Sequence, residues 1–151
     1  MRLRALSESP DVFLGKFDDE SGFQRNDWLK TFSAASWHGY FMGDEIVGIA
    51  KSAILMQYPD ERYVESFWVD PDHRNHKVGR EILQSIIAEA EKEKRAVIRL
   101  SVLRKNRPAI EIFRHLGFSV DAGRSNHDEI CLQLAISGQR ELAYTDSVPA
   151  E

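Results

Sequence analysis

A basic segment between a strand-like run and a helix-like run is the part of the sequence best suited to bind an anion. It spans residues 70–80, DPDHRNHKVGR, and its basic side chains are Arg74, His76, Lys77 and Arg80, in a chain whose net charge is −4. The first turn of a helix presents N–H groups without intrahelical partners and the positive end of the helix dipole, and both attract phosphate. The segment therefore predicts an anion site, although a solvated basic turn that binds nothing is an equally simple interpretation.

Two histidines and the single cysteine carry reactive side chains, but their sequence context does not favour metal binding or nucleophilic catalysis. His73 and His76 are three residues apart, whereas the histidines of a helical zinc motif are four apart, so we predict no metal site. Cys131 lies between Ile130 and Leu132, which is typical of a small core residue rather than of a nucleophile. It is the only cysteine, so neither an internal disulfide nor a cysteine-rich zinc site can form.

Composition and charge narrow the class of protein. The chain has 151 residues, 42% hydrophobic and 29% charged, which predicts a single globular domain over 1–137 followed by a tail of little hydrophobic periodicity over 138–151. The net charge of −4 argues against nucleic-acid binding, which needs a basic surface. The sequence contains no run of about 18 apolar residues and no secretory signal, so we expect no membrane association and a cytoplasmic location.

The first half of the chain predicts short elements separated by turn residues. Ser9-Pro10 is a typical helix start, and Ser21 and Gln24 have the spacing of a capping box after a turn over 18–22. Gly43-Asp44 separates two strand-like runs and predicts a hairpin. The expected elements are a strand over 2–6, helices over 9–17 and 21–35, and strands over 37–42, 45–56 and 63–69.

The second half alternates strands and helices. Apolar residues recur at helical spacing from Val78 to Ala90 and predict a long amphipathic helix. The other expected elements are strands over 96–103, 118–122 and 129–136 and a helix over 108–116. Together these elements predict an α/β fold whose mixed, mostly antiparallel central sheet has about seven strands and is flanked by helices. The strand-helix-strand unit over 63–102 implies one parallel crossover, and the last two strands form a hairpin.

Two motifs, each after a predicted strand, resemble those of the GNAT family of N-acetyltransferases. The first is Val69-x-Pro71-x-x-Arg74-Asn75-His76-Lys77-Val78-Gly79. It resembles the acetyl-coenzyme A (acetyl-CoA) signature, with Gly79 at its second glycine and Lys77 in place of its first. The second is Asn106-x-x-Ala109-x-x-x-Phe113-x-x-x-Gly117-Phe118, which is similar to the family motif except that Phe113 replaces a tyrosine. The order of elements over residues 2–136 is also similar to that of the family.

The resemblance implies a binding site for acetyl-CoA without a metal. In the family, the strand matching 63–69 splays from the next strand at a bulge, so the backbone of Phe67, Trp68 and Val69 would contact the pantetheine arm. The pyrophosphate would be held by the loop and by the first turn of the helix that follows it, at Arg74, Asn75, His76, Lys77, Val78, Gly79 and Arg80. Asn106 and Ala109 would also contact the cofactor, and Phe113 would pack near its thioester. For Asn106, a cap on the following helix is the alternative interpretation.

The implied reaction is direct attack of an amine on the acetyl thioester, and it requires a base, because an ammonium must first lose a proton. Some family members carry a glutamate base on the strand matching 63–69, and here Glu65 is the candidate. Strand alternation would place it with Tyr63, Phe67 and Val69 in an apolar setting that raises its pKa. The alternative is a glutamate that faces solvent or pairs with Arg62.

The acceptor is expected to be a small-molecule or peptide amine. Phe113 has no proton to give, so water, the amine, Tyr63 or Tyr144 would protonate the departing thiolate. Two other functions stay open: an acetyl-CoA-binding sensor or interaction module with little catalysis, which Lys77 and Phe113 favour, and a phosphate-responsive interaction protein that binds no coenzyme A. Exposed strand edges are compatible with a homodimer.

Overall fold

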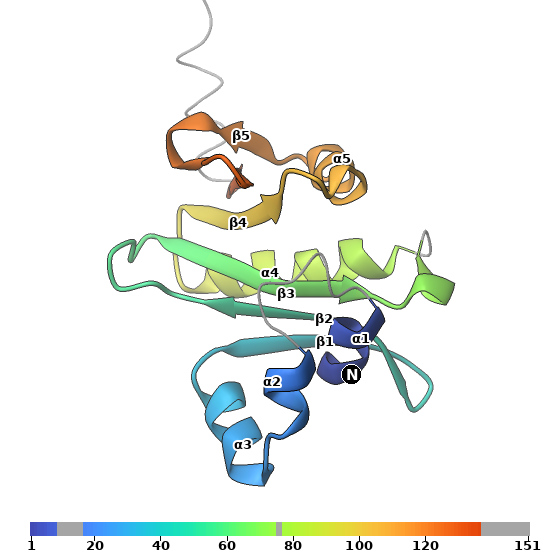
Figure 1. Cartoon of the computed structure of the whole chain (residues 1–151). Helices are drawn as coiled ribbons and strands as arrows, with labels where there is room; N and C mark the ends of the chain where they lie inside the picture. Colours follow the sequence, from blue (N-terminus) through green and yellow to red (C-terminus); the bar gives the residue numbers. More distant parts are fainter. Residues whose placement is uncertain (9–16, 75–76, 137–151) are drawn as a thin grey trace, which may run out of the picture.

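The computed structural model describes residues 1–8, 17–74 and 77–136. Six strands form one sheet in the order β1-β2-β3-β4-β6-β5 (Figure 1). All neighbouring strands are antiparallel except β3 and β4, which are parallel. The strands are β1 (Ser36–Met42), β2 (Glu45–Ala53), β3 (Glu61–Val69), β4 (Val97–Leu103), β5 (Ser119–Asp121) and β6 (Glu129–Ala135). The prediction of a mixed, mostly antiparallel sheet with one parallel crossover is confirmed.

The described part of the chain has six strands instead of about seven, because residues 2–6 belong to helix α1 (Arg2–Glu8). The run RLRALSE consists mainly of good helix formers and has no β-branched residue, so local preference favours a helix. Ala5 and Leu6 are adjacent and both buried. A strand would turn them to opposite faces, so the alternation in the sequence was misleading.

The remaining helices differ from the predictions mainly at their ends. They are α2 (Phe17–Ser21), α3 (Arg25–Ser33), α4 (Val78–Lys92) and α5 (Arg107–His115), with short 3-10 helices at Pro71–His73 (η2) and Ala122–Arg124 (η3). The turn predicted over 18–22 is largely helical. Helix α3 starts later than predicted because Gln24 and Asp27 form its capping box, in which Gln24 N donates to Asp27 Oδ2 over 2.9 Å. None of the described helices is long and apolar enough to span a membrane.

Two predicted segments lie outside the described residues. These are nearly all of the helix over 9–17 and the tail over 138–151.

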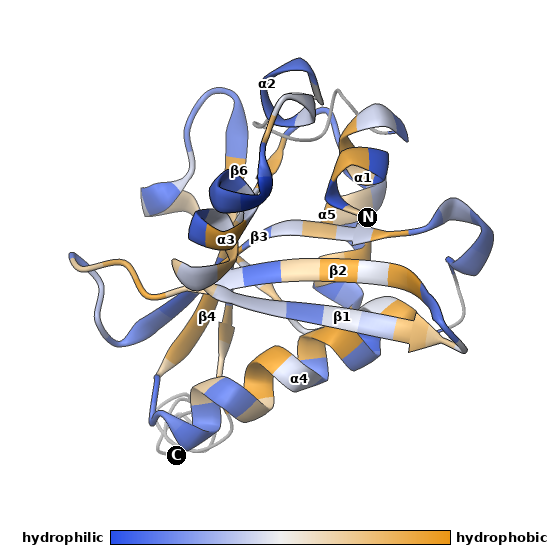
Figure 2. Cartoon of the chain, turned by 90° about the horizontal axis from the view of Figure 1, so that it is seen from below, coloured by the Kyte–Doolittle hydropathy of each residue, from blue (hydrophilic) through white to orange (hydrophobic). Residues whose placement is uncertain are grey.

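Helix α4 covers one face of the sheet and contributes much of the main core. Its buried residues are Val78, Ile82, Leu83, Ile86 and Ala90, at the spacing that predicted the helix. Figure 2 shows the hydrophobic side of α4 turned towards the strands. Full burial of a large aliphatic side chain contributes about 1.5 to 3 kcal/mol, so this face holds α4 firmly against the sheet.

Helix α1 lies against the opposite face (Figures 1 and 2). Ala5 of α1 forms a small buried cluster with Ile49 of β2 and Trp68 of β3, and the partly buried Trp37 packs against it. Helix α5 instead joins the α4 side, since Ile110 and Phe113 belong to the main core.

The two predicted hairpins are confirmed. Strands β1 and β2 are joined at residues 43–44, and Gly43 has a φ of 63°, which glycine adopts without strain. Strands β5 and β6 pair as an antiparallel hairpin across a longer connection.

Strands β3 and β4 pair along less than half of β3 and then diverge. Residues 61–64 of β3 pair with residues 97–100 of β4, whereas β4 is paired with β6 along its whole length. Opposite β2, strand β3 has one extra residue at a bulge, where Ser66 has a φ of 57°. A bulge bends its strand and increases the local twist. It separates β3 from β4 here, as the family resemblance implies.

Two buried arginines hold the sheet and its surroundings together. Arg62 donates two hydrogen bonds to the Glu93 carboxylate just beyond α4, over 2.9 and 2.8 Å. Arg99 of β4 donates to both carboxylate oxygens of Glu61 over 2.8 and 2.7 Å, and to Asp121 Oδ2 over 2.8 Å. The second arginine therefore ties β3, β4 and β5 together at the end of the sheet where β3 and β4 are still paired.

Candidate active site

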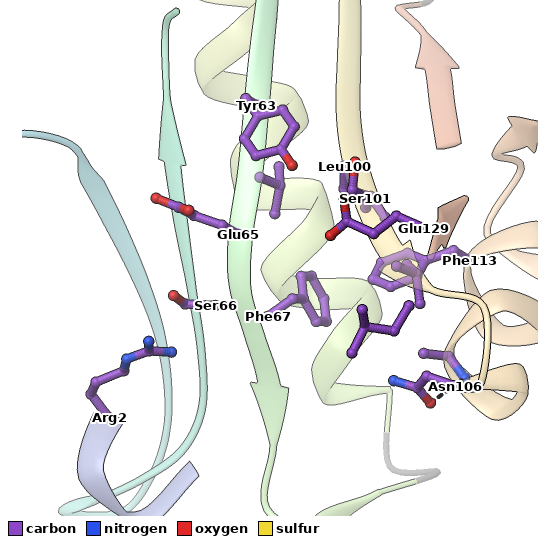
Figure 3. Close-up of a pocket in the computed structure, with 14 residues that line it drawn as sticks. Arg2, Tyr63, Glu65, Ser66, Phe67, Leu100, Ser101, Asn106, Phe113 and Glu129 are labelled. Atoms are coloured by element: carbon purple, nitrogen blue, oxygen red, sulfur yellow. Dashed lines mark hydrogen bonds between the residues drawn. The ribbon is translucent and has the colours of Figure 1, made fainter. Parts of the chain in front are cut away.

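A cavity of about 150 Å³ lies where β3 and β4 diverge (Figure 3). Its walls include four of the residues predicted to bind the cofactor, which are Phe67, Asn106, Ala109 and Phe113. They come from β3, from the end of the loop before α5 and from α5 itself. The fold thus brings together residues about 40 positions apart in the sequence. They meet in the wedge-shaped gap between two splayed strands that the resemblance implies.

Phe67 and Phe113 form the apolar wall of the cavity. Their ring centroids are 5.2 Å apart in an edge-to-face arrangement, and Phe113 also packs edge-to-face on Phe118 at 5.5 Å. A Cβ atom at Gly79 would lie 3.5 Å from the Phe67 ring. The second glycine of the first motif therefore lets α4 start close beside this wall.

Asn106 caps helix α5, which is one of the two roles that the sequence left open, and its position at the cavity is compatible with the other. Its Oδ1 accepts a hydrogen bond from the backbone N–H of Ala109 over 3.4 Å, which makes it the N-cap of α5. Figure 3 shows its amide nitrogen turned towards the cavity. A primary amide still has N–H hydrogens to donate when its oxygen caps a helix, so Asn106 can bind a ligand carbonyl as well.

Glu65 does not lie in the apolar setting that alternation predicted. The bulge at Ser66 reverses the alternation, so that Phe67 packs against the α4 core while Glu65 remains on the other face of β3. Its carboxylate is 2.6 Å from Lys51 Nζ, and the side chain is 47% exposed. Glu65 is among the residues that line the cavity, and its ion-pair partner is Lys51 rather than Arg62.

The side chains of Trp68 and Val69 are not among the cavity walls. Trp68 is buried against α1, and Val69 packs against the α4 core. What both can offer a ligand is their backbone, on the edge of β3 that faces β4 and that pairs with no strand of the described sheet. The carbonyl of Val69 already accepts a hydrogen bond from Arg74 Nε over 3.0 Å.

The start of α4 has the features of an anion site. Arg74, Lys77 and Arg80 are exposed around it, and its N-cap position has no side-chain hydrogen bond to the first turn. The first N–H groups of the helix are therefore open to a ligand. Val78 is buried and anchors this turn. The predicted binding residues Asn75 and His76 lie outside the described residues.

Lys77 has a left-handed backbone with φ 64° and ψ 5°. This conformation is the one that glycine adopts most easily, and it explains why the family pattern has glycine here. For lysine it is strained by roughly 1 kcal/mol. Lys77 thus adopts, at the position of the motif's first glycine, a conformation that a glycine would adopt without strain.

Asp70 positions the loop before α4, and sequence reasoning missed this role. The side chain is 2% exposed, and its Oδ2 is 2.7 Å from Arg4 Nη1. Its Oδ1 accepts the N–H of Asp72 over 3.1 Å, while its own N–H donates to Val47 O over 2.8 Å. The sequence assigns Asp70 no such role, because nothing in it indicates the contact with α1.

The lining of the cavity also includes Tyr63 of β3, Ser101 of β4 and Glu129 of β6. Burial raises the pKa of Tyr63, and the negative charges of Glu129 and Glu65 add to this effect, while a hydrogen bond with Ser101 opposes it. Tyr63 was predicted only as a substitute proton donor, and the other two were missed. Their proximity depends on strand register, which hydrophobic patterning does not fix between distant strands.

Comparisons with known proteins agree with this geometry. A sequence profile described as the Acetyltransferase (GNAT) family matches residues 3–118. The chain is 31% identical over 118 residues to the [Ribosomal protein bS18]-alanine N-acetyltransferase of Escherichia coli K12, a match that covers 72% of this chain and 80% of that protein.

Two solved structures have a similar fold. The ribosomal-protein-S18-alanine N-acetyltransferase of Escherichia coli superposes with a TM-score of 0.63 and 21% identity, over 89% of this chain and 88% of that one. The PaiA N-acetyltransferase of Thermoplasma acidophilum, solved with coenzyme A, gives a TM-score of 0.70 and 14% identity, over 89% and 87%. With the profile match over most of its length, the splayed strands and the two motifs, the chain belongs to the GNAT family of acetyltransferases.

Proposed function

We propose that this GNAT enzyme transfers an acetyl group from acetyl-CoA to the primary amine at the N-terminus of a protein or peptide. The observation that carries the proposal is the divergence of β3 from β4, which leaves an unpaired strand edge next to a cavity. An extended ligand with amide groups fits such an edge, because backbone groups there still need hydrogen-bond partners.

The described residues fit acetyl-CoA. The start of α4, with Arg74, Lys77 and Arg80, would hold the pyrophosphate, together with Asn75 and His76 between them. The backbone of 67–69 and the amide of Asn106 would hold the pantetheine arm, and Ala109 and Phe113 would enclose its end. When bound, acetyl-CoA supplies an acetyl group activated as a thioester.

An N-terminal amine is the acceptor favoured by the relatives. The Escherichia coli protein that is 31% identical over 118 residues is named as an alanine N-acetyltransferase of ribosomal protein bS18. An α-amino group has a pKa of about 8, against about 10.4 for lysine, so more of it is neutral and nucleophilic near pH 7. A peptide N-terminus therefore requires less activation than a lysine side chain or a similar aliphatic amine.

The first experiment measures whether acetyl-CoA stabilises the protein. At about 100 times its Kd, a ligand adds roughly 2.7 kcal/mol, which raises Tm by several degrees. Arg74→Ala removes a phosphate partner and Gly79→Glu places a negative side chain in the first turn of α4, so both variants should lose this rise. Lys92→Ala, an exposed lysine at the other end of α4, is the matched control and should keep it.

The second experiment measures coenzyme A release with peptides that differ in their N-terminal residue and with small primary amines. Release of coenzyme A with peptides supports the proposal. Faster release with a small amine would mean that the acceptor is a small amine rather than a peptide. A rise in Tm without release from any amine would instead support an acetyl-CoA sensor. If acetyl-CoA does not change Tm at all, the cofactor assignment is wrong.

A further inference from the structure

Three side chains from three different strands converge on the gap between β3 and β4. They are Tyr63, Ser101 and Glu129, and Figure 3 shows the Tyr63 hydroxyl and the Glu129 carboxylate directed into this gap. Strand register brings them there. Ser101 is opposite Cys131 in the β4–β6 ladder, so Glu129, two residues before Cys131, is its diagonal neighbour on the same face.

The Glu129 carboxylate is half-buried and close enough to Tyr63 for its charge to act on the phenol. The Ser101 hydroxyl is also near enough to the Tyr63 phenol to oppose the rise in its pKa. Among the residues that the structure describes, no lysine, arginine or histidine forms an ion pair with Glu129. Arg2, the basic side chain of the cavity lining, is paired with Glu20 at 2.8 Å.

Glu65, the other carboxylate that lines the cavity, differs from Glu129 in its orientation and in having an ion-pair partner. It lies on the side of β3 that faces β2 in Figure 3, and Lys51 Nζ is 2.6 Å from its Oε1. The Glu65 carboxylate therefore already has a cation as its partner, on the side of β3 away from β4. Of the two, Glu129 is in the better position to meet a substrate amine inside the cavity.

We propose that Glu129 is the general base of this enzyme and accepts a proton from the ammonium group of the acceptor. The inference rests on the proposed function and names the residue that performs one of its steps. The neutral amine nitrogen then forms the new N–C bond to the acetyl carbon as the C–S bond breaks. Of the two protons that the nitrogen loses, Glu129 passes one to solvent, and the other reaches the departing sulfur through water.

The contribution of such a base depends on pH in a recognisable way. A positioned base typically accelerates a reaction by about 10² to 10⁴. Its contribution falls once the pH exceeds the pKa of the amine, which is about 8 for a peptide N-terminus, because the amine is then already neutral. A residue with a purely structural role would lower activity equally at all pH values.

The test compares Glu129→Gln with two other variants in coenzyme A release from the best peptide acceptor. At pH 7 we expect kcat/KM of Glu129→Gln to fall by roughly 100-fold, and the deficit to shrink to a few-fold by about pH 9.5. Asp128→Asn is the matched control, because Asp128 is the adjacent carboxylate and is 83% exposed, so its activity should match that of the parent protein. Glu65→Gln should lose less activity than Glu129→Gln.

A binding measurement supplies a readout that does not depend on turnover. Titration calorimetry of the peptide into the complex with coenzyme A should show a Kd roughly tenfold higher for Glu129→Gln, because a charge-assisted hydrogen bond to the ammonium is lost. An N-acetylated peptide, which has no ammonium, should bind parent and variant alike. Tm values equal to that of the parent establish that the variant is folded.

Three outcomes separate the hypotheses. If the parent releases coenzyme A and Glu129→Gln does so within twofold at pH 7, Glu129 is not the base although the proposed function stands. If Glu65→Gln shows the large, pH-dependent loss instead, the base is Glu65. If the parent binds acetyl-CoA but acetylates no amine, the proposed function itself fails.

Discussion

The Arg4 guanidinium and the Asp70 carboxylate meet at 2.7 Å, which joins α1 to the loop that precedes α4. Asp70 is almost completely buried at the end of β3, whereas the Arg4 side chain is 38% exposed. Asp70 also accepts the N–H of Asp72 in the same loop. The path of the loop towards the proposed phosphate site is thus fixed from outside the loop, by a residue of the N-terminal helix.

Replacement of Asp70 should therefore affect both stability and ligand binding. Breaking a fully buried ion pair costs about 3 to 5 kcal/mol, and the exposure of Arg4 reduces this, so we expect Asp70→Ala to lower the free energy of unfolding by about 2 kcal/mol. The Kd for acetyl-CoA should rise as the loop loses its anchor. Urea unfolding and calorimetry measure both effects. Asp72→Asn, an exposed neighbour, should change stability by less than about 0.5 kcal/mol, and an equal effect there would refute the anchoring role.

Gly48 of β2 allows α4 to approach the sheet closely. A Cβ atom there would be 2.7 Å from Ile82 Cδ1 and 2.8 Å from Val78 Cγ1. We expect Gly48→Ala to reduce the free energy of unfolding by about 1 to 3 kcal/mol, because α4 must shift. Gly39→Ala on β1 is the control, since its nearest contact would be an ordinary 3.7 Å from Phe41. Similar losses in both variants would exclude the steric explanation.

Phe113 occupies the position where the family motif has a tyrosine. It is 6% exposed and lines the cavity beside Phe67. We expect Phe113→Tyr to raise kcat several-fold without changing the Kd of acetyl-CoA, because the phenol can protonate the departing thiolate. Phe113→Leu, which adds no proton donor, should show no such rise. An unchanged kcat in Phe113→Tyr would mean that thiolate protonation does not limit the rate.

Glu61 should make the stability of the fold sensitive to acid. Burial would raise the pKa of Glu61, but hydrogen bonds and charge from Arg99 and Arg124 outweigh burial and lower it below its usual 4.5. The folded state then holds fewer protons than the unfolded state. The resulting stability is present above about pH 4.5 and is lost as the pH falls through the lower folded value.

Urea unfolding between pH 7 and pH 3 measures this contribution. Glu61→Gln should be less stable than the parent at pH 7 and should lose less further stability below pH 4.5. Glu111→Gln, an exposed carboxylate on α5, should leave the pH dependence unchanged. Identical pH profiles for the parent and Glu61→Gln would contradict the assignment.

Sequence patterns were most informative where a single element determines its own structure. The apolar residues from Val78 to Ala90 predicted α4, and its buried residues lie at that spacing. Asn106 was predicted both as a ligand contact and as a helix cap, and its oxygen does cap α5. Gly43 identified a tight turn because few other residues adopt its positive φ.

Patterns failed where the outcome depends on a distant partner. A one-residue bulge at Ser66 reverses the faces of all later β3 residues, so Glu65 and Phe67 separate although alternation had joined them. Ser101 and Glu129 become neighbours only through the register of β4 and β6. The start of the chain was misread for a different reason, because the preference of residues 2–8 for a helix was given too little weight.

The four-residue parallel contact between β3 and β4 also has a consequence for folding. Strands β1 to β3 pair through local connections within 36–69, and strands β4 to β6 do so within 97–135. In the described sheet, the strands of the two halves pair with each other only at 61–64 and 97–100, after the intervening α4 crossover has closed a long loop. Closing a long loop costs more entropy than closing a hairpin, so contacts distant in sequence form slowly. We therefore expect the pairing of β3 with β4 to form later than the local contacts with which each half can begin to fold.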